Sequence, residues 1–201
     1  MKFFELDTLH QVGMGACSFE PVAKIKRLDP PLCDVCGAKL GPLRRIPPYT
    51  YKMTSKHVAD VVTDGGVFAV SPRFIECFSS SGLTGLEFSK DAITITNSSA
   101  TFYMAHPPYT YTLIDTEASG AVLRTLVGCA KCGVAAYYKI DRIVIREDTW
   151  PNADVFMLSG LMGVVLVTER LVDFVHANQL TGFSFLNQDS YHYDYTSVFE
   201  R

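Results

Sequence analysis

The chain has 201 residues, of which 48% are apolar and 12% aromatic, and its net charge is −3 at pH 7. This composition excludes a disordered chain, and the length predicts one domain, or two closely packed halves, with a sizeable core. Glu5 and Asp7 stand where a secretory signal would be apolar, and the longest apolar run, 155–167, is interrupted and too short for a membrane helix. We therefore expect a cytoplasmic protein that spans no membrane.

The first distinctive element along the chain is Cys-Asp-Val-Cys-Gly at 33–37, and Cys-Ala-Lys-Cys-Gly recurs at 129–133. Two residues between cysteines let both thiolates of a tight turn face one metal ion, and the glycine supplies the positive φ that such a turn often needs. Two turns of this kind complete a tetrahedral shell with no open position, which indicates a structural zinc ion rather than a catalytic one. The candidate zinc ligands are Cys33, Cys36, Cys129 and Cys132.

Other interpretations of these cysteines are a disulfide framework and a thioredoxin-like redox pair. Disulfides would suit a secreted protein, whereas we expect a cytoplasmic one. A redox pair does not explain why the Cys-x-x-Cys motif occurs twice and is followed by glycine both times. We therefore favour zinc. The isolated Cys17 and Cys77 are interpreted as ordinary buried thiols.

Residues 67–88 have a near copy at 164–185, at an offset of 97 residues that almost equals the offset of the two cysteine pairs. In each copy a short apolar run predicts a strand and the next residue, Ser71 or Thr168, is a good helix N-cap. Apolar residues at helical spacing follow, and Gly82 or Asn178–Gln179 lies near the end of each helix. Leu-Thr-Gly then leads into a second strand. We expect the two copies to be equivalent strand-helix-strand units, with Arg73 and Arg170 at matching positions.

The remainder of the chain is rich in β-branched and aromatic residues, which predicts strands near 92–96, 101–104, 109–114 and 139–145. Together these patterns predict an α+β fold in a single compact domain, 1–201. Its two duplicated halves, about 1–98 and 99–201, would each contain a zinc knuckle and a strand-helix-strand unit, joined at one four-cysteine zinc site.

Motifs of catalysis are missing from the sequence. It has no Gly-x-Ser-x-Gly elbow, no His-Glu-x-x-His pair, no phosphate-binding loop and no dinucleotide fingerprint, and its five histidines are scattered. We therefore expect that the protein is not an enzyme. An alternative function is zinc-dependent nucleic-acid binding or regulation, because six cations crowd around the first cysteine pair. They are Lys24, Lys26, Arg27, Lys39, Arg44 and Arg45.

The two Cys-x-x-Cys-Gly motifs, the stretch from Val70 to Gly85 and the C-terminal stretch from Asp154 to Phe183 resemble the double-CXXCG family of immunity proteins, known chiefly from myxobacterial toxin–immunity pairs. The resemblance spans 33–185. It implies a small cytoplasmic protein that binds and neutralises a cognate polymorphic toxin. Residues 101–201 hold 7 basic and 11 acidic side chains, so we expect a basic toxin as the partner and consider nucleic acid an unlikely one.

The C-terminal tail carries the candidate partner-binding residues. Tyrosines alternate there with polar residues, so in an extended conformation their rings would share one face. Tyrosine is enriched at interface hot spots, and acidic side chains could meet the cations of a toxin. An edge strand whose tyrosines pack on the core is the other interpretation. The residues are Asp189, Tyr191, Tyr193, Asp194 and Tyr195.

Overall fold

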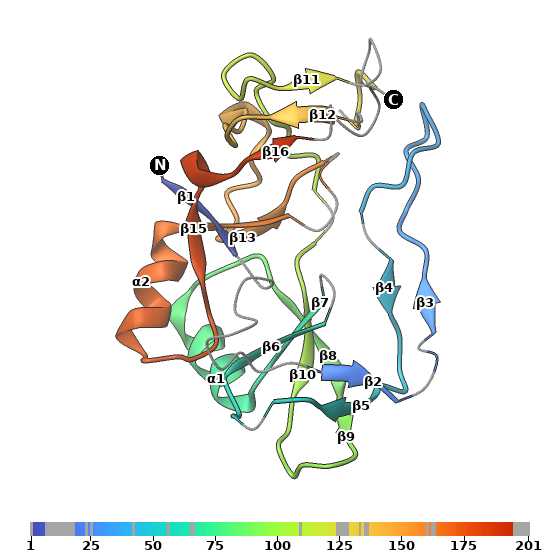
Figure 1. Ribbon diagram of the computed structural model, residues 1–201, viewed down its shortest axis with the longest axis vertical. Coiled ribbons are helices and arrows are strands. Elements are labelled where there is room, and N and C mark those ends of the chain that lie inside the picture. Colours follow the sequence, from blue (N-terminus) through green and yellow to red (C-terminus); the bar gives the residue numbers. More distant parts are fainter. Residues whose placement is uncertain are drawn as a thin grey trace.

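The structure is a computed structural model that describes residues 2–6, 19–22, 24, 26–41, 43–55, 57–64, 67–108, 110–123, 129–132, 134, 137–159, 161 and 164–194; of residues 63, 64, 67, 193 and 194 it describes the backbone. It is a mixed α+β fold with two helices and many strands in small sheets (Figure 1). The strands are β1 (Phe3–Leu6), β2 (Phe19–Pro21), β3 (Arg27–Leu28), β4 (Arg44–Arg45), β5 (Thr50–Met53), β6 (Val61–Asp64), β7 (Val67–Val70), β8 (Glu87–Ala92), β9 (Thr94–Ile95), β10 (Tyr103–His106), β11 (Val122–Leu123), β12 (Tyr137–Ile140), β13 (Val155–Met157), β14 (Val165–Thr168), β15 (Phe185–Asn187) and β16 (Tyr193–Asp194). The helices are α1 (Pro72–Ser81) and α2 (Glu169–Ala177), with 3-10 turns at Glu147–Thr149 and Gln188–Ser190.

Both near copies in the sequence form a strand, a helix and a second strand. In the first copy β7, α1 and β8 follow one another, and their sheet has the order β6-β7-β10-β8. In the second copy β14, α2 and β15 follow one another, and their sheet has the order β13-β14-β1-β15. The two four-stranded sheets therefore have corresponding strand orders.

In each of these two sheets, one of the two inner strands comes from the other half of the chain. β1, near the start of the sequence, pairs with β14 and β15, whereas β10 pairs with β7 and β8. The registers match as well, because Phe4 pairs with Val167 as Tyr103 pairs with Val70. Each sheet thus includes one strand from the opposite half of the chain.

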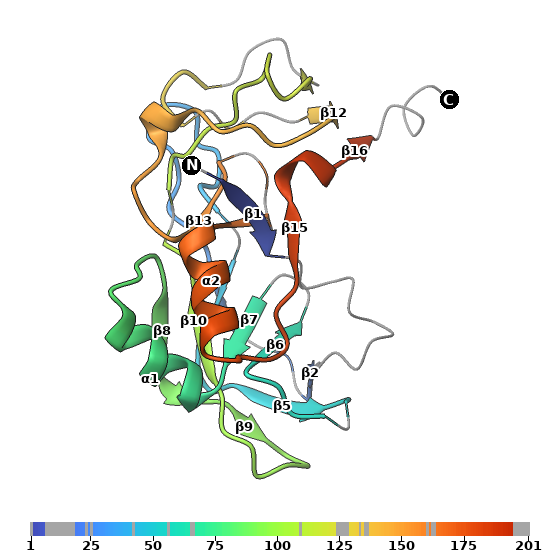
Figure 2. The same ribbon diagram turned by 90° about the vertical axis from the view of Figure 1, so that its left-hand side faces the viewer.

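The helices begin and end as the sequence predicts. The Ser71 hydroxyl accepts a hydrogen bond from the backbone N–H of Phe74, and Gly82 ends α1 with a φ of 73°. Thr168 occupies the N-cap position of α2, but its hydroxyl makes no cap hydrogen bond to the helix. Both helices lie on one side of the molecule (Figure 2). Their buried faces share one apolar core with the central strands, in which Phe74 stacks on Phe183 and meets Phe174 edge-on.

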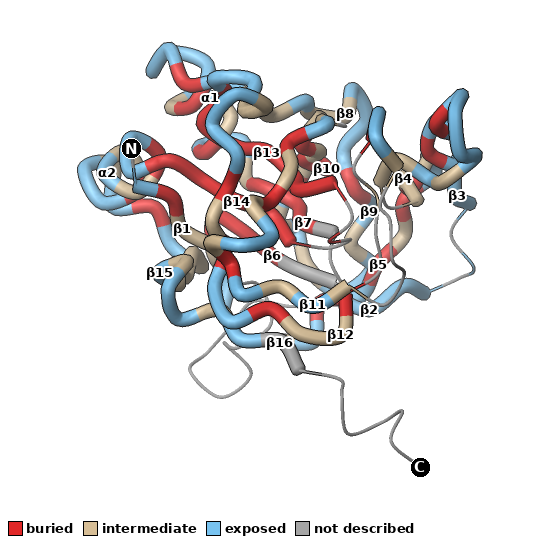
Figure 3. The backbone as a smooth tube through the Cα atoms, turned by 90° about the horizontal axis from the view of Figure 1, so that it is seen from above, coloured by how far each residue is buried: buried red, intermediate tan, exposed pale blue. Residues whose placement is uncertain are grey.

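Two further apolar clusters flank this core. One contains Phe19, Tyr51 and Phe102 around the three-stranded sheet β2-β5-β9, and the other contains Ile140 and Phe156 near the sheet β11-β12-β16. Burial is concentrated in the central strands (Figure 3). The predicted strand at 109–114 is wrong as a continuous strand, because Thr112 and Ile114 form only isolated bridges, to Leu158 and Ile145.

One segment, 26–46, extends along the side opposite the helices, and we call it the arm (Figure 1). β3 and β4 pair at its base, where Ile46 N–H donates to Lys26 O, and the first cysteine pair lies at its tip. Among the described residues no helix is long and apolar enough to cross a membrane.

Candidate metal centre

The four predicted cysteine ligands meet at one point of the structure. All four Sγ atoms lie within 4.8 Å of one another. Cys33 Sγ is 3.9 Å from Cys129 Sγ, and Cys36 Sγ is 3.6 Å from Cys132 Sγ. Four thiolates at tetrahedral corners about 2.3 Å from a zinc ion would be separated by roughly 3.8 Å. The cluster can therefore hold one metal ion.

Local hydrogen bonds form the first cysteine turn at the tip of the arm. Gly37 N–H donates to Cys33 O at 2.8 Å, and Cys33 N–H donates to Ala38 O at 2.9 Å. Gly37 has a φ of 71°, a conformation that other residues rarely adopt, which explains the glycine after the second cysteine. Its counterpart Gly133 lies outside the described residues.

The second cysteine turn is anchored to the body of the protein. The buried Ser159, just after β13, donates its hydroxyl hydrogen bond to Cys132 O, and its own N–H donates to Thr112 O at 2.8 Å. The cluster consequently joins a turn fixed on the core to a turn at the tip of the arm.

The thiols of the cluster differ in pKa. Backbone N–H groups of Cys132 and Lys131 lower the pKa of Cys129 to about 6, and those of Cys36 and Val35 lower the pKa of Cys33. Burial raises the pKa of Cys132 to about 12. Since a metal binds thiolates, a lowered pKa favours the form of the cysteine that can act as a ligand.

An ion pair connects the two cysteine turns next to the thiols. Lys131 Nζ lies 2.8 Å from Asp34 Oδ2, and this hydrogen bond, together with the opposite charges, lowers the pKa of Asp34 and raises the pKa of Lys131. Half of the cations proposed as phosphate contacts are already engaged within the chain. Lys39 pairs with Asp29, Arg44 pairs with Glu87, and Arg45 is buried against Tyr51.

Two buried carboxylates that we had not singled out from the sequence hold the helices in place. Asp60 accepts hydrogen bonds from Ser71 Oγ at 2.8 Å and Thr181 N–H at 2.9 Å, and pairs with Arg73 at 3.3 Å. It thus joins the start of α1 to the Leu-Thr-Gly loop of the other copy.

Asp154 makes the reciprocal set of contacts. It accepts hydrogen bonds from Thr168 Oγ1 at 2.7 Å and Thr84 N–H at 3.0 Å, and pairs with Arg170 at 3.2 Å. It joins the start of α2 to the first Leu-Thr-Gly loop. The sequence contains one signal that could have identified Asp60 and Asp154: each lies directly before a strand, β6 or β13, at a similar place in its half of the chain.

The predicted tail residues are only partly described. Asp189 is exposed in a 3-10 turn, and Tyr191 is half-buried against the cluster that contains Ile140 and Phe156. Tyr193 and Asp194 form β16, which pairs with β12, and Tyr195 lies outside the described residues. Cys17 also lies outside them, and Cys77 is half-buried rather than fully buried.

This geometry defines a class of protein: a mixed α+β chain in which a potential metal centre ties distant segments together, far from the helices. The sequence matches the Immunity protein family (Imm11) over residues 9–190. Because this match spans most of the chain, the chain belongs to this family, and the resemblance to an immunity protein family is confirmed. The family implies an immunity function directed against a toxin. No curated protein matches the sequence.

Proposed function

We propose that this protein is a cytoplasmic, non-catalytic inhibitor that binds a cognate polymorphic toxin and neutralises it. The family match over 9–190 is the observation that supports this function most directly. An inhibitor of this kind needs a stable surface complementary to its partner rather than a reactive site, which agrees with a sequence free of catalytic motifs.

The metal we propose is a single structural zinc ion bound by Cys33, Cys36, Cys129 and Cys132. The support is the donor set: four thiolates, two pairs of which have S–S separations of 3.6 Å and 3.9 Å, suit tetrahedral zinc and provide no open position for a substrate. The ion would fasten the arm to the body, so its binding free energy would contribute to the stability of this part of the fold.

We further propose that the fold is one domain, 1–201, built from two duplicated halves at about 1–98 and 99–201. Support comes from the corresponding strand orders, the matching registers of β1 and β10, and the reciprocal contacts of Asp60 and Asp154. Each half would contribute one cysteine turn to the zinc site and one strand to the sheet of the other half.

The toxin is proposed to be basic overall, since residues 101–201 carry more acidic than basic side chains and could steer a cationic partner. The tail residues Asp189, Tyr191, Tyr193, Asp194 and Tyr195 are retained as a proposed contact region. The exposed position of Asp189 agrees with this proposal.

Coexpression with the product of the adjacent upstream gene tests the function. We expect the two proteins to copurify and the immunity protein to restore growth of cells that express the toxin. As a control for the level of expression, the toxin is coexpressed with a variant of the immunity protein that lacks both cysteine pairs. Toxicity that persists at every expression ratio, with no complex on size-exclusion chromatography, would refute the proposed function.

A further inference from the structure

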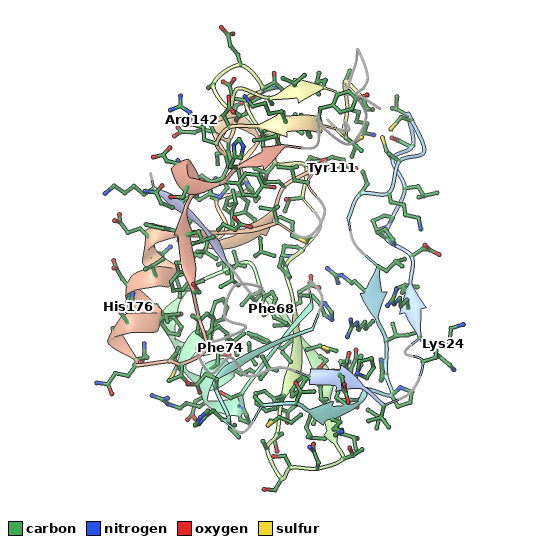
Figure 4. All side chains as sticks on the ribbon, in the orientation of Figure 1. Lys24, Phe68, Phe74, Tyr111, Arg142 and His176 are labelled. Carbon is green, nitrogen blue, oxygen red and sulfur yellow. The ribbon has the colours of Figure 1, made fainter. Side chains whose placement is uncertain are left out.

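The arm exposes large apolar side chains to solvent. Leu28, Leu32 and Val35 are 57%, 59% and 67% exposed, and Tyr111 of the body, at 44%, faces the tip of the arm (Figure 4). Such residues are common singly on a protein surface, but several together indicate an interaction site. Among the described residues, only seven large apolar side chains have this degree of exposure, and four of them are these.

A groove lies between the arm and the body beside these residues. Its volume is about 310 Å³, and one wall comes from the arm while the other comes from the segment around Tyr111. The two walls are separated in sequence and are joined by the thiol cluster and by the Asp34–Lys131 ion pair. The lining residues are Pro31, Leu32, Asp34, Leu40, Thr110, Tyr111 and Lys131.

Charge is distributed unevenly along this surface. Near the groove the charges compensate one another, because Asp29 pairs with Lys39 at 2.7 Å and Asp34 pairs with Lys131. At the base of the arm, three exposed cations make no ion pair within the part of the chain that the structure describes: Lys24, Lys26 and Arg27. Figure 4 shows Lys24 at this end of the arm. The surface is thus apolar and neutral at the tip and positive at the base.

We propose that this surface of the arm, with Leu28, Leu32, Val35 and the groove to Tyr111, is where the toxin docks. This inference rests on the proposed function, and it identifies the local chemistry of the partner. The toxin would insert an apolar side chain into the groove and place acidic residues along Lys24, Lys26 and Arg27. An apolar anchor in a pocket, surrounded by compensated polar groups and a charged margin, is the usual anatomy of a protein–protein interface.

The requirement for acidic residues is local and differs from the basic net charge proposed for the whole toxin. The overall charge of a basic toxin would steer its approach towards the acidic second half and the tail around Asp189, whereas its apolar anchor and a local group of acidic residues would bind the arm. The two contact regions are on different segments, so substitutions distinguish them.

The test measures binding of the purified, metal-loaded protein to the inactivated toxin encoded by the adjacent upstream gene. Leu32→Glu and Val35→Glu place a charge on exposed positions, so folding and metal content should be unchanged, and affinity should fall at least about tenfold. The double variant Lys24→Glu, Lys26→Glu should associate about tenfold more slowly at low salt, with a smaller difference at high salt.

Val58→Glu is the matched control, because Val58 is 59% exposed and does not line the groove. Its affinity should stay within about twofold of the wild type. If the wild type binds the toxin and both arm variants, Leu32→Glu and Val35→Glu, bind it equally well, the arm is not the docking surface, although the proposed function stands. Loss of affinity confined to Asp189→Lys would assign the tail instead. If the wild type does not bind the toxin, the proposed function and this inference fail together.

Discussion

Gly85 lies where the first Leu-Thr-Gly loop crosses the backbone of β13. A Cβ atom at this position would be 2.0 Å from the carbonyl oxygen of Val155, whereas real Cβ contacts are essentially never below 3.0 Å, and its φ is 98°. Gly85→Ala must therefore displace the loop from β13 by about 1 Å and strain the backbone. We expect a loss of about 3–4 kcal/mol in the free energy of unfolding, which corresponds to a melting temperature lower by about 10 °C.

Two other glycines supply matched comparisons. Gly182 occupies the same place in the second loop, with its Cβ position 2.6 Å from Val61 O, so Gly182→Ala should also destabilise the protein strongly. Gly82 has a φ of 73° but nothing within 4 Å, so Gly82→Ala should cost only about 1 kcal/mol, from the backbone alone. Thermal unfolding, monitored by circular dichroism, gives the order of stability of the three variants. Equal melting temperatures for the Gly85 and Gly82 variants would refute the close-approach explanation.

Three other predictions concern the metal, a buried charge and pH. The purified protein should contain one zinc ion per chain, and Cys33→Ser should lower the occupancy and speed hydrogen exchange in the arm; full occupancy with unchanged exchange would contradict this. Asp154→Ala should lower the free energy of unfolding, measured by chemical denaturation, by about 3 kcal/mol or more, because it leaves Arg170 and a backbone N–H without their buried acceptor. Asp189→Ala, at an exposed site, should change the free energy of unfolding by less than about 0.5 kcal/mol. Burial and a nearby arginine lower the pKa of His106 from 6.5 to about 4, so the folded state resists a proton that the unfolded chain accepts. Stability should be fully present above pH 6.5 and fall towards pH 4 by up to about 1.4 kcal/mol per pH unit, and His106→Gln should flatten the dependence of melting temperature on pH over this window.

Local features of the fold could be predicted from the sequence because they depend on neighbouring residues. Ser71 and Gly82 mark the start and end of α1, and the cysteine pairs identify the thiol cluster through spacing alone. The expected strand at 109–114 was wrong, since β propensity reports a pleated, half-buried environment and Thr112 and Ile114 find only single bridging partners there.

Apart from the meeting of the two cysteine pairs, the long-range contacts could not be predicted. Asp154 has the composition of a solvated acidic residue, and only the fold shows that it is buried between Thr84 and Arg170. Likewise, nothing in the four residues of β1 specifies that its partners are β14 and β15, because the pairing is decided by which edges remain open after the helices pack. The arm also escaped prediction, because the sequence predicts that the two cysteine turns meet but not that segment 26–46 extends along the body between them.

The exchange of β1 and β10 between the two sheets has a consequence for synthesis on the ribosome. β1 emerges first, yet the strands beside it, β14 and β15, begin only at Val165 and Phe185. At a translation rate of about 5–20 residues per second, β1 waits on the order of ten seconds for its partners. The second sheet can therefore be completed only after β15 has been made, and a nascent chain that ends before Val165 lacks both strands that pair with β1. Glu5 lies in the middle of β1, and its charge opposes pairing of this strand with other chains before its own partners have been made.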